Sequence, residues 1–407
     1  MNQNSLYRCI YKFVESLPAF SDHDHHHPDK FFREGMSLDR LLKNSYVEWF
    51  GLLPDPSENS RREFLDHQRF NTSFVWLEKG IQAVHGVRTR IAVESWERLS
   101  RRIGEEYRLD PDFHWRTLSR KGFKTMVLDT YWNPGDDNGH PGLFKPTFRI
   151  DKFMYGFHAD ALAPNEFIPW RRYGFKGGTF DDYIDLMYST IRSRHRAGGL
   201  VAFKCAEAYN RSISFQPDDR KAAQRAFGIP PDRITEEQKI IFGNYIFNRC
   251  CELAAELDVP FQVHTGLAQL KGSQPMNFES TIIRHPRTRF VLFHAGFPWT
   301  HQLAGLAFNH PNVLLNMGWA ATLCTSSAIR ALHDYMDVSR SINTITWGSD
   351  CWTAEESVGA LLAWRFIVSK VLTERIGDGR ISRKDAELLA RKLIFENGSR
   401  VYLKNKQ

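Results

Sequence analysis

From residue 123 onward the chain alternates short apolar segments with longer amphipathic segments of helical periodicity. Near-continuous apolar strands separated by helices are typical of a parallel sheet covered on both faces. With the histidine-rich segment that precedes them, eight candidate strands can be counted, namely HDH, VLDT, FRID, AFK, QVHT, LFHA, LLNM and TWGSD. Eight strands, without a GxGxxG fingerprint, favour an α/β fold of the (β/α)8 TIM-barrel type over an open doubly wound sheet.

The length of 407 residues lies at the upper end of the range for one barrel, so we expect a single domain over residues 1–407. Residues 38–119 have a helical and aromatic pattern with no good strand. We therefore predict a helical insertion after the first strand. An insertion at that end of a barrel is typically a lid or a wall of the substrate pocket.

Two helix starts are visible among the alternating segments. The segment FDDYIDLMYSTIRSRHRAGG opens with Asp181 and Asp182, which are candidates for its N-cap. Ahead of a later long helix, Thr235 and Gln238 have the spacing of a capping box.

Composition narrows the class of protein. The formal charge of +7 is spread among acidic residues, and no RNP motif, zinc finger or phosphate loop is present, so an anionic small substrate is favoured over nucleic acid. Six cysteines without CxxC spacing indicate a reducing, cytoplasmic environment. The amphipathic start is not a signal peptide, and no run of about 18 apolar residues suggests a membrane span.

The segment FSDHDHHHP holds four histidines and two aspartates within residues 20–28. Imidazoles at alternate positions of a strand leave on one face, so a short strand can offer two ligands to one cation. Further polar residues stand at the carboxyl ends of later strands, namely Lys204, His264, His294 and Asp350. In a barrel these ends converge, which predicts a divalent metal site, with zinc the best fit and manganese or iron as alternatives.

Five motifs in order resemble the amidohydrolase superfamily and, within it, the amidohydrolase-related (amidohydrolase 2) branch. They are HDHH at 23–26, VHTG at 263–266, FHAGFP at 293–298, the strand NVLLNMGW, and GSD at 348–350. The ending FENGSRVY is also similar to the final helix of that branch, so the resemblance covers about residues 20–403.

The resemblance implies roles for five residues. His23 and His25 match a first-strand HxH pair, His264 and His294 the histidines of the fifth and sixth strands, and Asp350 the eighth-strand aspartate. In the family the HxH pair and the aspartate bind metal, and the fifth-strand histidine often does. The sixth-strand histidine binds a second metal or contacts substrate, and the aspartate commonly accepts the proton of metal-bound water.

Two departures from the family pattern leave alternatives open. Ser21 stands where the family has an aspartate, so His25 and His27 form a possible second register, although Pro28 favours His23 and His25. Lys204 stands where binuclear members carry a carboxylated lysine. Lys204 is therefore a candidate metal bridge, catalytic base or substrate contact, and one metal ion is expected rather than two.

Arginines and aromatic residues follow the third and fourth strands. Arg149 and Arg211 are candidates for binding a substrate carboxylate, because guanidinium geometry matches it, while ordinary ion pairs are the alternative. Tyr209 and Trp132 lie near them in sequence and are further substrate-binding candidates.

The function predicted from these residues is metal-dependent hydrolysis of an amide, ester or lactone bond in a small, carboxylate-bearing substrate. A cation lowers the pKa of water, Asp350 accepts the proton, and His294 steadies the oxyanion. The resemblance also admits uronate-isomerase-like or decarboxylase activity at the same site, and a non-catalytic regulatory protein with a structural metal. It implies a possible homo-oligomer.

Overall fold

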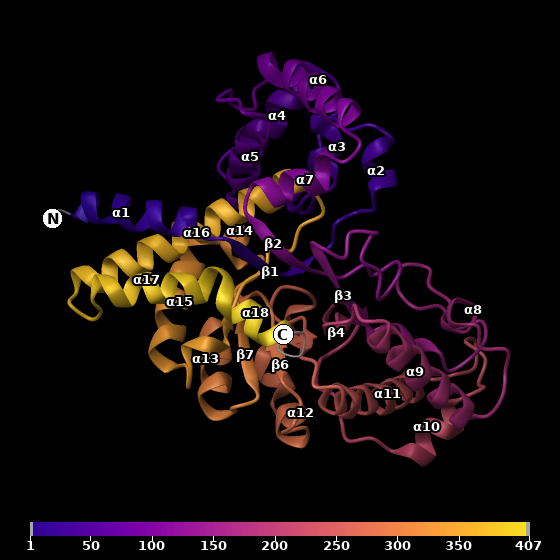
Figure 1. The fold of residues 1–407 in the computed structure, drawn as a ribbon. Coiled ribbons are helices and arrows are strands. Elements are labelled where there is room, and N and C mark those ends of the chain that lie inside the picture. Colours follow the sequence, from indigo (N-terminus) through magenta and orange to yellow (C-terminus); the bar gives the residue numbers. More distant parts are fainter. Residues whose placement is uncertain (1–2, 404–407) are drawn as a thin grey trace.

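The computed structural model describes residues 3–403, which form one barrel with helices around it (Figure 1). Its strands are all parallel and neighbour one another in sequence order. They are β1 (Ala19–Asp24), β2 (Phe123–Leu128), β3 (Phe144–Arg149), β4 (Ala202–Cys205), β5 (Phe261–Val263), β6 (Phe290–Leu292), β7 (Val313–Asn316) and β8 (Ile345–Thr346). The predicted (β/α)8 barrel is confirmed.

Backbone hydrogen bonds join the first strand to residues that follow the last strand, which closes the barrel. Asp22 N donates to Trp347 O at 3.0 Å, and Asp350 N donates to His23 O at 2.8 Å. The pairing of β1 with β2 shifts register between Ser21 and Asp24. Irregularities of this kind re-aim side chains, and here the shift falls at the start of the histidine-rich segment.

The helices that cover the barrel follow the predicted alternation. They are α1 (Gln3–Ser16), α8 (Pro169–Tyr173), α9 (Phe180–Arg196), α10 (Arg220–Ala226), α11 (Glu236–Glu256), α12 (Glu279–Arg284), α13 (Thr300–Asn309), α14 (Ala320–Leu323), α15 (Thr325–Val338), α16 (Ala354–Gly377), α17 (Arg383–Arg391) and α18 (Asn397–Tyr402). No helix within residues 3–403 has the length and apolar character to cross a membrane.

One predicted helix cap is confirmed and one is wrong. Thr235 and Gln238 form the predicted capping box of α11. At α9 the N-cap is Thr179, whose hydroxyl accepts from Asp182 N, while the Asp182 carboxylate accepts from Thr179 N at 2.7 Å. Asp182 therefore occupies the third helical position and Asp181 the second, because Thr179 has the extended backbone that a cap needs.

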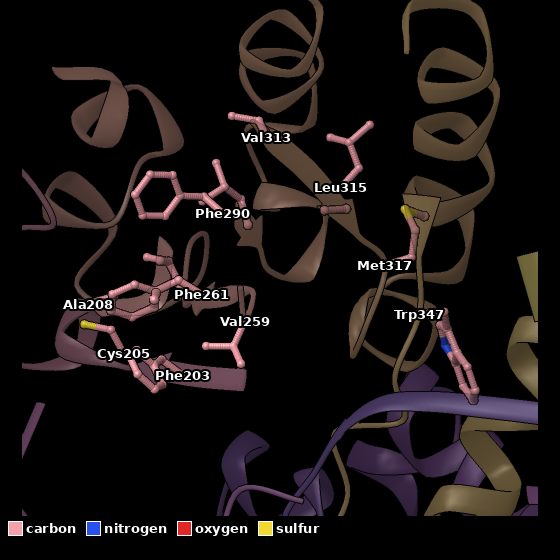
Figure 2. Close-up of a cluster of buried hydrophobic side chains, with 14 of the residues drawn as sticks. Phe203, Cys205, Ala208, Val259, Phe261, Phe290, Val313, Leu315, Met317 and Trp347 are labelled. Carbon is pink, nitrogen blue, oxygen red and sulfur yellow. The ribbon is translucent and has the colours of Figure 1, made fainter. Parts of the chain in front are cut away.

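Side chains alternate between two apolar layers along the strands. Figure 2 shows the layer that includes Phe203, Phe261, Phe290 and Leu315. A second cluster contains the alternate residues Val127, Ala202, Val291 and Leu314, together with Val401 and Tyr402 from the end of the chain. Two positions further along β2 and β4, on the face of this second cluster, lie Asp129 and Lys204, so polar groups begin where the apolar filling of the barrel ends.

Between β1 and β2 the chain forms a group of helices with its own hydrophobic cluster, seen in indigo and purple in Figure 1. They are α2 (Asp29–Arg33), α3 (Leu38–Lys43), the short η1 (Tyr46–Phe50), α4 (Glu58–Gln68), α5 (Thr72–His85), α6 (Val93–Leu109) and α7 (Phe113–Arg120). The buried His85 connects this group to the barrel, because its ring nitrogens contact Glu106 of α6 at 2.8 Å and Glu355 of α16 at 3.0 Å.

The pH dependence of stability tests this connection. Burial lowers the pKa of His85, but the hydrogen bonds and charges of Glu355 and Glu106 outweigh it, so the folded pKa is raised above 6.5. A raised pKa contributes stability that is complete below the unfolded value and is lost as the pH rises through the folded value. We expect His85→Gln to lower the free energy of unfolding by about 2 kcal/mol at acidic pH and by less at alkaline pH.

Urea unfolding of wild type and His85→Gln at pH values near 5.5 and 8.5 measures this difference. His301→Gln is the matched control, because the His301 side chain is 86% exposed. A difference between wild type and His85→Gln that is equal or larger at the alkaline pH would contradict the prediction.

Candidate metal centre

Three residues that lie in or just beyond the first and last strands meet at the carboxyl face of the barrel. Asp350 Oδ1 lies 3.2 Å from His25 Nε2 and 3.5 Å from His23 Nε2, and all three side chains are buried. Ligand atoms that share one ion at about 2.0–2.2 Å lie roughly 3 Å apart, so these separations fit a common cation. The three residues line a cavity of about 280 Å³.

The charge states of these groups also suit a divalent cation. Burial, followed by the neighbouring charge of Lys204, holds the pKa of His23 well below its ordinary value, so the ring is neutral. Burial alone would raise the pKa of Asp350, but the surrounding imidazoles, His25 first and then His294 and His23, hold it well below the ordinary value. His25 Nδ1 donates to Asp129 O at 2.8 Å, so the opposite ring nitrogen, Nε2, faces Asp350.

Asp129, at the end of β2, is a candidate ligand that the sequence reasoning missed. His23, His25 and Asp129 each offer a ligand atom within 4.8 Å of the others. Both Asp129 oxygens are engaged by Arg149, through Nε at 3.2 Å and through Nη2, so Asp350 is the better ligand. The available signal was its position, since Asp129 ends the second strand as Lys204 ends the fourth.

His264 and His294 form a pair beside the three residues. His264 Nε2 faces Leu267 O at 2.9 Å and His294 Nδ1 faces Gly318 O at 3.0 Å, so these nitrogens carry the hydrogens of neutral rings. The remaining nitrogens, His264 Nδ1 and His294 Nε2, lie 3.0 Å apart as two lone pairs. Such a pair requires a proton or a metal ion beside it. Burial lowers the pKa of His264, and that of His294 to about 4.

Lys204 lies within this group. Its Nζ is 3.3 Å from His23 Nε2 and 3.6 Å from the centre of the Phe293 ring. Burial lowers the pKa of Lys204 to about 7, although the charge of Asp129 opposes the shift. Lys204 Nζ is therefore close enough to His23 Nε2 to contact a cation or substrate bound there.

The two candidate ligand pairs, His23 with His25 and His25 with His27, have different surroundings. His27 Nε2 contacts Asn44 Oδ1 at 3.2 Å, and its ring stacks on Phe31 and on Trp132. Neither His27 nor Trp132 lines the cavity that contains His23 and His25. The geometry thus favours His23 and His25 as the ligand pair and places Trp132 away from it.

The other predicted substrate contacts are divided in the same way. Arg149 and Tyr209 line the cavity, whereas Arg211 donates to Asn244 Oδ1 at 2.8 Å and lines a different cavity. Aromatic residues that the sequence reasoning did not select also form the wall, namely Tyr46, Trp49, Tyr131 and Trp352. Tyr46 and Trp49 belong to η1, so the helices between β1 and β2 contribute to this wall.

Two of the site residues have unusual backbone conformations. His294 has φ of 62° and Asp350 has φ of 61°, in the left-handed region that residues other than glycine rarely adopt. Such conformations persist only where the surrounding structure enforces them, and they are concentrated at functional sites. Their occurrence at two converging strand ends supports a functional role for this face.

Comparisons with known proteins agree with this geometry. Residues 110–367 match a family model described as amidohydrolase. Protein fluG of Emericella nidulans is 24% identical over 229 residues, which are 51% of this chain but only 26% of that protein, so the chain spans about a quarter of its relative.

Two solved structures show the same fold. The uronate isomerase of Thermotoga maritima has a TM-score of 0.78 at 15% identity over 99% of both chains. The glucuronate isomerase of Caulobacter crescentus has a TM-score of 0.78 at 17% identity over 100% of this chain and 95% of its own. Because the family model matches more than half of the sequence, the chain belongs to the amidohydrolase family.

Proposed function

We propose that this protein is a metal-dependent hydrolase that acts on a small, carboxylate-bearing substrate. His23, His25 and Asp350 would hold one divalent cation, for which zinc is the best fit to two imidazoles and a carboxylate. When bound, such a cation lowers the pKa of water and polarises a carbonyl oxygen. The observation that carries the proposal is the Asp350 carboxylate, which lies 3.2 Å from the His25 ring and 3.5 Å from the His23 ring at the cavity wall.

Different side chains would then carry out the separate steps of hydrolysis. Asp350 accepts the proton of the attacking water and passes it to the leaving group. His264 is a further candidate ligand beside these residues, and His294 would steady the developing oxyanion from the cavity wall. Lys204 stays in the proposal as a base or charge partner beside His23, while its role as a carboxylated bridge would require a second ion.

The cavity supports a small anionic substrate with an amide, ester or lactone bond. Its volume of about 280 Å³ is at the lower end for ligand pockets. The basic side chains Arg149, Lys152 and Lys204 offset nearby carboxylates, so a bound divalent cation would leave the site positive. We propose Arg149 and Tyr209 as substrate contacts.

Isomerisation of a uronate is the second candidate function. The observation that favours it is the match of nearly the whole chain, on both sides of the comparison, to two proteins named as uronate and glucuronate isomerases. Such a reaction moves protons on the substrate without net hydrolysis. It would use the same His23, His25 and Asp350.

The choice of histidines is testable by metal content. We expect His25→Ala to reduce affinity for zinc by at least about 100-fold, because removing a ligand costs more than altering the residues behind it. His27→Ala is the matched control and should bind zinc as wild type does. Metal analysis by mass spectrometry after dialysis against a weak chelator measures both, and loss of zinc in His27→Ala alone would contradict this assignment.

The catalytic proposal is testable with Asp350→Asn. Zinc-loaded wild type is assayed on N-acyl amino acids, lactones and D-glucuronate, and the substrate turned over fastest is used for the variant. We expect kcat to fall by about 100-fold to 10,000-fold, since the amide cannot accept the proton. Full turnover by Asp350→Asn with metal retained would refute the role, and conversion of D-glucuronate alone would favour the isomerase.

A further inference from the structure

Asp151 is a buried carboxylate in the cavity of the metal site. It follows β3, in the short helix η2 (Ile150–Tyr155), and is 4% exposed. Its Oδ2 lies 3.4 Å from Ala206 N and 3.8 Å from Arg149 Nη1. Its Oδ1 has no hydrogen-bond partner within residues 3–403. A buried acceptor without a partner is costly and calls for an explanation.

The neighbouring basic side chains have other partners. Arg149 is hydrogen-bonded to both oxygens of Asp129, and Lys152 Nζ donates to Pro164 O at 2.7 Å. Neither therefore supplies the missing hydrogen bond to Asp151 Oδ1. Since Asp151 lines the cavity, a donor on a bound molecule can supply it.

We propose that Asp151 determines substrate specificity by accepting, through Oδ1, a hydrogen bond from a hydroxyl or amino group of the substrate. The inference rests on the proposed metal function and deepens it. Arg149 contacts Asp151 and also Asp129, whose carboxylate lies 3.9 Å from the His25 ring.

A second cavity and a second buried carboxylate, that of Glu207, support this assignment. A second cavity of about 850 Å³ shares four lining residues with the first, namely Pro164, Asn165, Tyr209 and Asn210. It is lined by the buried Glu207, which accepts from Tyr155 Oη at 2.8 Å. Burial and the charge of Asp151 raise the pKa of Glu207 to about 7. Two carboxylates that repel each other favour a donor group near them.

Hydroxamates provide a test that needs no known substrate, because their head group chelates metal. Zinc-loaded protein is titrated by calorimetry with two sets matched in length. The short set is glycine hydroxamate, glycolohydroxamate and propanohydroxamate, and the long set is γ-aminobutanohydroxamate, γ-hydroxybutanohydroxamate and pentanohydroxamate. We expect the amino or hydroxyl member of one set to bind about tenfold or more tightly than its methyl-terminated counterpart.

Substitution of Asp151 should abolish that preference. In Asp151→Leu the donor and methyl members of the set should bind alike, with the affinity of the methyl member changed by less than about threefold. Asp151→Ala, whose side chain has no acceptor, serves the same comparison if the leucine variant does not fold. Asp160→Asn is the matched control, because Asp160 lines only the second cavity.

The outcomes separate the inference from the function on which it rests. Equal binding of donor and methyl members by wild type, or a preference that persists in both Asp151 variants, would overturn the role of Asp151 alone. Failure of every hydroxamate to bind zinc-loaded wild type would overturn the proposed metal function, and the role of Asp151 with it.

Discussion

The hydrogen bond from Asp350 N to His23 O is the contact on which the site depends. It joins the end of the last strand to the first strand, so residues more than 300 positions apart in sequence become neighbours. Buried side chains reinforce this junction, since Ser349 N donates to Ser21 Oγ at 2.8 Å and Ser21 Oγ donates to Asp24 Oδ2 at 2.6 Å. Ser21, which departs from the family pattern, thus helps to close the barrel.

The closing of the barrel at this junction also buries the side chains of the site and so shifts their pKa values. Burial alone would raise the pKa of Asp350, and the three imidazoles around it reverse that effect. The same burial keeps His23 and His264 neutral, with lone pairs available. Neutral imidazoles around an ionised carboxylate form a donor set that gains most from a divalent cation. Aromatic side chains form part of the cavity wall beside them.

Much of this arrangement was predictable because barrel geometry turns sequence position into spatial position. All six predicted residues lie near or just beyond the carboxyl ends of strands, and the parallel fold brings such residues to one face. They are His23, His25, Lys204, His264, His294 and Asp350. Asp129 obeys the same rule, and was missed because no motif of the resembling family marks it.

Contacts made by residues outside the strands could not be predicted from strand position alone. Nothing in the spacing of Tyr46 and Trp49 reveals that η1 folds back over the cavity, because that depends on the packing of a separate helical group. Arg211 and Trp132 follow strands as Arg149 does, yet local partners hold them elsewhere. The cap of α9 was misplaced for a related reason, since Thr179 competes for that position through its own backbone conformation.

The metal site that we propose is one cation held by His23, His25 and Asp350. Anomalous diffraction at the zinc absorption edge, from crystals of the zinc-loaded protein, tests it most directly. We expect one strong peak about 2.0–2.2 Å from His23 Nε2, His25 Nε2 and an Asp350 oxygen. A peak bound by His27, or one remote from Asp350, would contradict it.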